Sequence, residues 1–200
     1  MTQGHYQAAI AAFDKANGED PNQEMHEGKA YPKELLYSLR MGEMQERFAP
    51  EASEAVKLAV RAQHIRRWMI PRNEFPMDRQ GYLQWRTRLY KFHAQTAGDL
   101  MREAGYGEEM VERVMTAVSK KGLKVNPETQ LMEDVGGLVF LEHYMMGFAS
   151  KHPEYSEEKW IPIINKTWQK MSPRAQEFAL AGKIKLPEAL VPLILKAVQG

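Results

Sequence analysis

Apolar residues recur three or four positions apart along most of this chain, and no stretch alternates strictly between apolar and polar residues. Such spacing places apolar side chains on one face of a helix, whereas a half-buried strand needs a period of two. The sequence therefore predicts an all-α fold of about eight or nine helices. With 200 residues the chain can bury a core without disulfides, and residues 1–200 are expected to form a single domain.

Prolines, glycines and capping residues predict where these helices begin and end. Pro32 suits the first turn of one helix, and Asp78 suits the N-cap of the longest one. Residues 32–150 are expected to form the helical core, and the helices of residues 156–200 are expected to pack on it. The predicted helices cover residues 5–17, 32–49, 51–68, 79–104, 107–119, 127–149, 156–171, 173–182 and 186–198. The loops near residues 18–31, 69–78 and 120–127 are candidate walls of a functional site.

Composition excludes several classes of function. The chain has no cysteine, which excludes disulfides, thiolate catalysis and Cys-ligated zinc or iron–sulfur centres. Lys and Arg number 27 against 26 Asp and Glu, so the net charge of +1 does not favour nucleic acid as a partner. No apolar run approaches the roughly 18 residues of a membrane span, and the N-terminus lacks a signal-peptide pattern. We therefore expect a cytoplasmic protein without a membrane partner.

Two histidines and two carboxylates are predicted to lie on or beside buried helix faces. His64 and His93 each follow an apolar residue by four positions, and Asp134, next to Glu133, precedes Leu138 by four. A carboxylate that points inward must be paired, hydrogen-bonded or metal-bound. Imidazole nitrogen and carboxylate oxygen are ligands of divalent metals. The pattern predicts either a metal site or polar residues that are satisfied within the core.

Arginine and aromatic residues accompany both histidines, in the segment RAQHIRRWMIPR and in the long helix predicted after it. Arginine offers a planar fork to phosphate or carboxylate, and tryptophan offers a stacking face. The combination predicts a pocket for an anionic small molecule or nucleotide, and the alternative is that the arginines are solvated and the tryptophans pack in the core. The predicted ligand-binding residues are Arg66, Arg67, Trp68, Arg72, Trp85, Arg86 and Tyr90. The basic loop at Lys120 and Lys121 is expected to be solvated surface.

Seven blocks of sequence, spread over nearly the whole chain, resemble domain-of-unknown-function family 4202. The blocks are AIAAFDKANGEDPN, PKELLYSLRM, AQHIRRWMIPR, FPMDRQGYLQWR, KFHAQTAGDLMREAGY, QLMEDVGGLVFLEHY and KTWQKMSP. This resemblance implies little about activity.

A more distant resemblance is to the HD-domain hydrolase superfamily, whose all-α members bind metal with His and Asp. VKLAVRAQHI resembles the helix that ends in the superfamily's His-Asp pair, with His64 at the His. KFHAQTAGDLMREAGY resembles the helix that carries a further His, which is His93, and QLMEDVGGL resembles the late block, with Asp134 at its Asp. The chain departs from the pattern at two places, because Ile65 stands at the pair's Asp and Tyr37-Ser38 lies near the early His.

This resemblance implies an HD-domain-like helical bundle and a metal-dependent phosphohydrolase that acts on a phosphorylated, nucleotide-like small molecule. The two histidines and Asp134 would bind a divalent metal, which would polarise a phosphoryl oxygen. Glu133 would be a further ligand or the general base, and Arg66, Arg67 and Arg72 would hold the anion. The alternative is a non-catalytic helical module that binds a nucleotide, RNA or protein through the same arginines and tryptophans.

Overall fold

The computed structural model describes residues 2–199, which form ten α-helices and one short β-hairpin. The helices are α1 (Thr2–Gly18), α2 (Lys33–Phe48), α3 (Glu54–Ala62), α4 (Arg79–Glu103), α5 (Glu108–Val118), α6 (Pro127–Val139), α7 (Met145–Lys151), α8 (Glu157–Lys170), α9 (Pro173–Leu180) and α10 (Val191–Gln199). The all-α prediction is confirmed, with ten helices in the described residues where eight or nine were expected. Residues 1 and 200 of the predicted domain lie outside the described residues.

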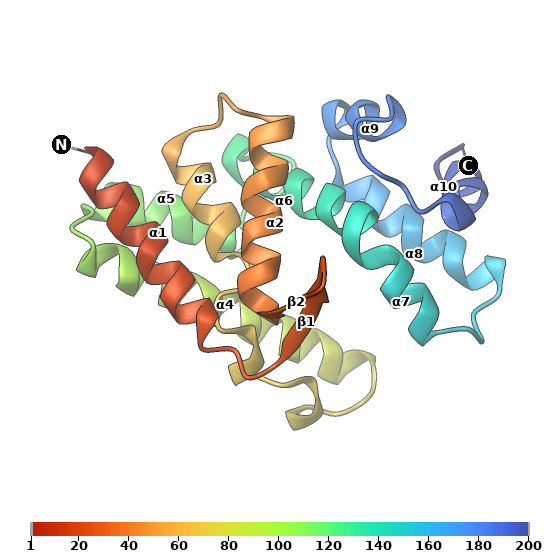
Figure 1. Ribbon diagram of the computed structural model, residues 1–200, viewed down its shortest axis with the longest axis horizontal. Coiled ribbons are helices and arrows are strands. Elements are labelled where there is room, and N and C mark those ends of the chain that lie inside the picture. The colour runs from red at the N-terminus through yellow and green to blue at the C-terminus, as the bar shows by residue number, and fades with distance from the viewer. Residues whose placement is uncertain (1, 200) are drawn as a thin grey trace.

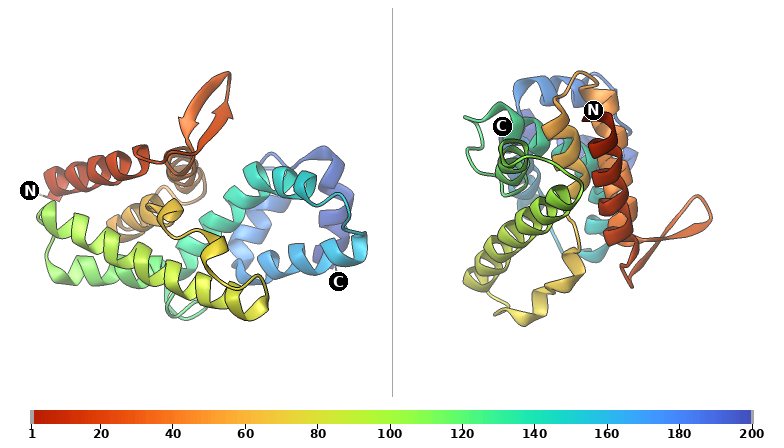
Figure 2. Two further views of the ribbon diagram at one scale, coloured as in Figure 1. Left: turned by 90° about the horizontal axis from the view of Figure 1, so that it is seen from below. Right: turned by 90° about the vertical axis from the view of Figure 1, so that its left-hand side faces the viewer.

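The helices form an elongated arrangement, and the two ends of the chain lie at its opposite extremes (Figure 1). α1 to α5 gather at one end and α7 to α10 at the other, as two further views show (Figure 2). α6 packs on α2, α3 and α5 on one side and on α8 and α9 on the other. Buried side chains from both ends, such as Leu58 of α3 and Ile164 of α8, belong to one continuous apolar cluster.

The predicted helix boundaries have clear physical causes where the structure confirms them. The Asp78 side chain accepts a hydrogen bond from the Gly81 N–H at 2.7 Å and so caps α4. Gly105 ends the same helix in the left-handed region, with φ of 94°. Pro127 occupies the first turn of α6, as expected, behind an Asn126 N-cap.

The polar stretch before Pro32, which was expected to be loop, contains a β-hairpin. β1 (Gln23–His26) pairs antiparallel with β2 (Lys29–Pro32) around a turn in which Glu27 and Gly28 have φ of 50° and 77°. Two successive positive φ values are typical of the tight turns that join twisted strands. Strands of four residues are too short to show a clear alternation, which is why the pattern did not predict them. The hairpin projects from the helical body (Figure 2).

Two predicted helices are shorter or less regular than expected. The helix predicted over residues 51–68 ends at Ala62, and the chain turns through Arg66, which has φ of 51°, into a short 3-10 turn η1 (Arg67–Met69). The Asn17 side chain of α1 accepts the Arg66 N–H at 3.1 Å and stabilises this turn, a tertiary contact that helical periodicity does not encode. A π-helical turn η3 (Phe140–Tyr144) separates α6 from α7.

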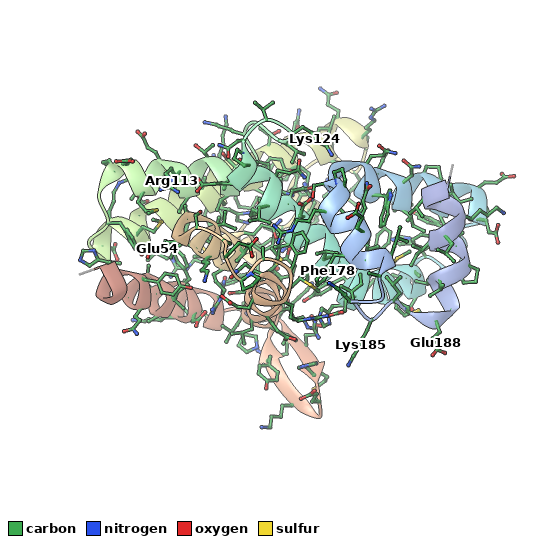
Figure 3. The ribbon with its side chains drawn as sticks, turned by 90° about the horizontal axis from the view of Figure 1, so that it is seen from above. Glu54, Arg113, Lys124, Phe178, Lys185 and Glu188 are labelled. Carbon is green, nitrogen blue, oxygen red and sulfur yellow. The ribbon has the colours of Figure 1, made fainter. Side chains whose placement is uncertain are left out.

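Two short 3-10 turns complete the element order, η2 (Arg72–Glu74) before α4 and η4 (Glu188–Leu190) before α10. Lys124, labelled in Figure 3, lies in the loop between α5 and α6 and donates to the carbonyl oxygen of Met171 at 3.2 Å. This bond ties the loop to the end of α8. No helix within residues 2–199 is long and apolar enough to cross a membrane.

Candidate functional site

A small pocket, here called the central pocket, lies where the chain leaves α3 and α5 and faces the middle of α4. Its walls combine two histidines with three cationic side chains. The lining residues are Gln63, His64, Arg67, Arg86, Leu89, Tyr90, His93, Val118 and Lys120. Five of them, His64, Arg67, Arg86, Tyr90 and His93, were predicted from the sequence as site residues. The structure therefore brings together the two histidines and three of the seven predicted ligand-binding residues.

The α4 wall consists of side chains spaced three and four residues apart, which places them on one face of the helix. The Arg86 guanidinium donates twice to the Tyr90 hydroxyl oxygen, from Nε at 3.2 Å and from Nη2 at 2.6 Å. Because arginine only donates, the tyrosine oxygen accepts both bonds and keeps its own hydrogen for another acceptor. Burial would raise the pKa of Tyr90, but Lys120 and Arg86 outweigh this effect and lower it.

His64 is held by three neighbours that fix its orientation and its tautomer. Its Nδ1 lies 3.5 Å from Glu34 Oε2, and its Nε2 lies 3.0 Å from Arg67 Nη1. Because a guanidinium only donates, Nε2 must accept and the ring proton must sit on Nδ1, facing the carboxylate. The Tyr37 ring stacks on the imidazole with centroids 4.0 Å apart, and its hydroxyl donates to Gln63 Oε1.

Both pocket histidines are neutral near pH 7. Burial lowers the pKa of His64 well below its usual range, and the charge of Arg67 lowers it further. Burial likewise lowers the pKa of His93 to about 3, with added lowering from Arg67 and Arg86. The two rings lie side by side, with centroids 5.9 Å apart. His93 is only 2% exposed, and its buried Nε2 has no hydrogen-bond partner within residues 2–199.

Glu34 titrates near neutrality. Its carboxyl is 6% exposed, and burial raises its pKa to about 7 against the lowering effect of Arg67 and Lys33. The N–H of Glu34 donates to Asp20 Oδ2 at 2.9 Å, so a residue before the hairpin fixes the start of α2. The carboxyl that faces His64 therefore changes its protonation state in the neutral pH range.

Lys120 enters the pocket from the turn after α5, although the sequence predicted a solvated loop there. Its Nζ lies 2.6 Å from Glu133 Oε2, and the two side chains are 16% and 10% exposed. Burial would raise the pKa of Glu133, but Lys120, Lys170 and Arg86 outweigh it and lower the pKa. The backbone of Lys120 has φ of 59°, a region that costs a residue other than glycine about 1–3 kcal/mol.

Arg67 and Arg86 have no carboxylate within 4.0 Å in the part of the chain that the structure describes. Seven other arginines do have one, namely Arg40, Arg47, Arg61, Arg66, Arg102, Arg113 and Arg174. The Arg67 guanidinium lies 5.0 Å from the Trp85 ring centroid, and the Trp85 indole donates to the Ile70 carbonyl oxygen at 2.8 Å. Two of the three cationic side chains of the pocket, Arg67 and Arg86, therefore have no direct ion-pair partner, while the third, Lys120, is paired with Glu133.

Several predicted site residues make structural contacts away from the central pocket. The Asp134 carboxylate accepts from the Ser172 N–H at 2.7 Å, from the Ser172 hydroxyl at 2.6 Å and from Gln130 at 2.9 Å. It therefore fixes the start of α9 and does not join the two histidines. Arg66 pairs with Glu19 at 3.0 Å, and Arg72 donates to backbone carbonyls at its own end of α4. Trp68 is half-buried and does not line the central pocket.

The residues present do not fit the divalent metal that the HD-domain resemblance implies. Among residues 2–199, no group of three or more His, Asp or Glu side chains is placed to hold a metal ion. Glu133, predicted as a ligand or general base, is paired with Lys120. Three cationic side chains also line the pocket, and they would repel a divalent cation there. A bound divalent metal stays a prediction.

Comparison with known proteins identifies the family. The family model described as "Domain of unknown function (DUF4202)" matches residues 7–194. The chain belongs to this family. The matched range contains every residue that lines the central pocket. No curated protein and no solved structure matches the chain, so the comparisons give the HD-domain resemblance no support.

Four residues of the site escaped the sequence analysis: Glu34, Tyr37, Gln63 and Lys120. Glu34 stands in the first turn of α2, where a carboxylate is common because it stabilises the helix dipole, so its position alone does not indicate a site. Its spacing to Tyr37 was a usable signal, since two polar residues three apart share a helix face. Gln63 directly precedes His64, but nothing local shows that it bonds Tyr37.

Proposed function

We propose that the protein binds a phosphorylated small molecule and holds its phosphoryl group in the central pocket. The observation that carries this proposal is the pair Arg67 and Arg86, whose side chains line one pocket, bond His64 and Tyr90, and have no carboxylate within 4.0 Å in the described residues. A charge taken partly out of water costs free energy unless an opposite charge compensates it. Charge-assisted bonds from arginine to phosphate supply that compensation.

The donor set suits a phosphoryl group better than a carboxylate. Arg67 comes from the turn after α3, Arg86 and Tyr90 from α4, and Lys120 from the turn after α5, while His93 forms part of the same wall. Donors from three directions match a group with three terminal oxygens and close to two negative charges. A carboxylate, with two oxygens in one plane, would leave part of this set unused.

The organic part of the ligand would lie outside the small pocket, against aromatic side chains next to Arg67. Tyr82 is 44% exposed, and its ring centroid lies 5.9 Å from that of Trp85, on which Arg67 packs. An exposed aromatic ring beside a phosphate site offers a face to a nucleobase or another flat group. This supports a nucleotide-like ligand over inorganic phosphate alone.

Calorimetric titration tests the proposal with inorganic phosphate, with nucleoside monophosphates and with the same nucleosides lacking phosphate. The wild type should bind the phosphorylated compounds and not the nucleosides. Arg86→Lys keeps the charge and loses the fork, so it should bind about ten- to a hundred-fold more weakly. Arg88→Lys, on the same helix and exposed, is the matched control and should bind like the wild type.

If the wild type binds none of the phosphorylated compounds, the proposal is wrong. Equal affinity in Arg86→Lys and Arg88→Lys would place the ligand elsewhere on the molecule. Elemental analysis of the purified protein tests the separate prediction of a bound divalent metal.

A further inference from the structure

We infer that His64 is a phosphoryl acceptor, whose Nε2 attacks the phosphorus of the bound ligand and forms a transient phosphohistidine. This inference rests on the proposed function, because it needs a phosphoryl group in the central pocket. The histidine lines that pocket beside Arg67 and Lys120, and its Nδ1 faces Glu34 at 3.5 Å.

The geometry around His64 is that of an oriented nucleophile. Its proton is on Nδ1, so the lone pair on Nε2 is the reactive one. Glu34 faces the protonated nitrogen, where it can stabilise the positive charge that the ring gains when Nε2 forms a bond to phosphorus. Tyr37 stacks on the ring with an angle of 12° between the planes and keeps it from turning. A nucleophile, a carboxylate that faces its protonated nitrogen and an aromatic ring stacked on it are therefore all present.

His93 lines the same pocket but lacks the same support. No carboxylate lies within 4.0 Å of it among residues 2–199, whereas His64 has Glu34. Its buried, unpartnered Nε2 is suited to contact an oxygen of the phosphoryl group and not to act as the phosphoryl acceptor. The two histidines thus have different roles.

Ligand binding also explains how Nε2 becomes available. In the unliganded pocket Arg67 Nη1 donates to Nε2 at 3.0 Å. A phosphoryl oxygen is a charged acceptor and a neutral imidazole is not, so the guanidinium gains by moving its bond to the ligand. The same anion that fills the pocket therefore uncovers the nucleophile.

The first step forms a bond between Nε2 and phosphorus and breaks the bond between phosphorus and the ester oxygen of the ligand. The electron pair of the broken bond stays on that oxygen, which takes the hydroxyl proton of Tyr90. Arg86 and Lys120 stabilise the tyrosinate, consistent with their lowering of its pKa. The Nδ1 proton stays on the ring and faces Glu34.

In the second step a water molecule attacks phosphorus and the bond between phosphorus and Nε2 breaks. The electron pair returns to Nε2, and Tyr90 recovers its proton from the water. The sum is a phosphomonoester plus water giving an alcohol plus phosphate, with no redox change and no further reactant. The reaction class is phosphomonoester hydrolysis through a phosphoenzyme.

Phosphoramidate is the probe for the first step, because its amine leaves already protonated and needs no acid. The 200-residue protein is incubated with it at neutral pH and analysed by mass spectrometry and phosphorus NMR. The wild type should gain one acid-labile phosphoryl group at His64, and Tyr90→Phe should gain it too. His64→Asn should gain none, and Glu34→Gln should react at least about ten-fold more slowly. His152→Asn, which alters a surface histidine, should react like the wild type.

Two results would overturn the inference. One is binding of inorganic phosphate by the wild type without any phosphoryl adduct at His64, which would leave the proposed binding function standing. The other is equal labelling of His5, His26, His152 and His64, which would mean unassisted surface chemistry. If the wild type binds neither inorganic phosphate nor any nucleoside monophosphate, the proposed function is rejected together with this inference. Phosphate titration of His64→Asn checks that this variant keeps its pocket.

Discussion

Glu34 Oε2 and His64 Nδ1 lie 3.5 Å apart, although one residue begins α2 and the other follows α3. The carboxyl is almost fully buried, and the charges that act on it are Arg67, Lys33, Asp20 and Glu24. Burial dominates this balance and raises the pKa of Glu34 to about 7. The pair is therefore poised to change its charge within the neutral range.

The raised pKa of Glu34 has a cost for stability that depends on pH. An acid whose pKa is higher in the folded state stabilises the fold when protonated, below its usual 4.5, and this stabilisation is lost as pH rises to about 7. Glu34→Gln keeps the shape and removes the charge. It should raise the free energy of unfolding at pH 8 by about 2–3 kcal/mol and change it little at pH 4.5.

Urea unfolding of the wild type and Glu34→Gln at the two pH values measures this difference. Glu103→Gln, on the exposed face of α4, is the control and should show no such pH dependence. A Glu34→Gln variant that is less stable than the wild type at pH 8 would show that the ionised carboxylate is held by interactions stronger than its burial penalty.

The fold was predictable because helical periodicity and capping are local. Asp78, Gly105 and Pro127 mark helix boundaries through backbone chemistry that a sequence displays directly. The hairpin at Gln23–Pro32 was not predicted, since its strands are too short to show a period. Helical periodicity and capping residues predict an element only where the segment itself is long enough to show the pattern.

The site was only partly predictable. His64 and Arg67 lie within the helix predicted over residues 51–68, but α3 ends before them and a turn brings them together. Asp134 satisfied the pattern of an inward carboxylate, but the residue it serves, Ser172, lies on a distant part of the chain. Lys120 was expected to lie in a solvated basic loop, but in the structure its side chain is largely buried and pairs with Glu133. Partners that are distant in sequence decide these roles.

Substitutions at Lys120 test two things: whether its backbone is strained and whether its ammonium group contributes to phosphate binding. Lys120→Gly and Lys120→Ala both remove the ammonium and its bond to Glu133, so both should lose phosphate affinity to the same extent. Glycine tolerates φ of 59° and alanine does not, so the glycine variant should be about 1 kcal/mol more stable than the alanine variant. Urea unfolding and phosphate titration measure the two quantities, and equal stabilities would argue against strain at this position.

Asp134 distinguishes the metal hypothesis from the anion-binding proposal. Asp134→Ala leaves the half-buried Ser172 N–H and hydroxyl without their acceptor, which should cost about 1–3 kcal/mol of unfolding free energy. Phosphate affinity should stay at the wild-type value, because this carboxylate does not line the central pocket. Thermal unfolding and titration of the same sample measure both. A large loss of ligand binding in a folded Asp134→Ala protein would favour a metal ligand.

Alanine substitutions at Gly136 and Gly137, which are adjacent in α6, can distinguish a change in the pocket from a change in helix packing as the cause of weaker phosphate binding. A Cβ added at Gly136 would lie 3.2 Å from Gln63 Nε2, so the Gln63 side chain must move and its bond with Tyr37 must loosen. Since Tyr37 stacks on His64, Gly136→Ala should weaken phosphate binding by about three- to ten-fold, roughly 0.7–1.4 kcal/mol.

Gly137→Ala is the control, because its Cβ would lie 2.9 Å from the flexible side chain of Met171 and far from the pocket lining. Replacing glycine by alanine in a helix stabilises it by up to about 1 kcal/mol in both variants. A variant that gains less than this shows that the neighbouring side chain, Gln63 or Met171, does not move easily to make room for the Cβ. Titration with phosphate should show a weaker Gly136→Ala and an unchanged Gly137→Ala. If the two variants bind equally well, the chain of contacts from α6 through Gln63 and Tyr37 does not position the His64 ring.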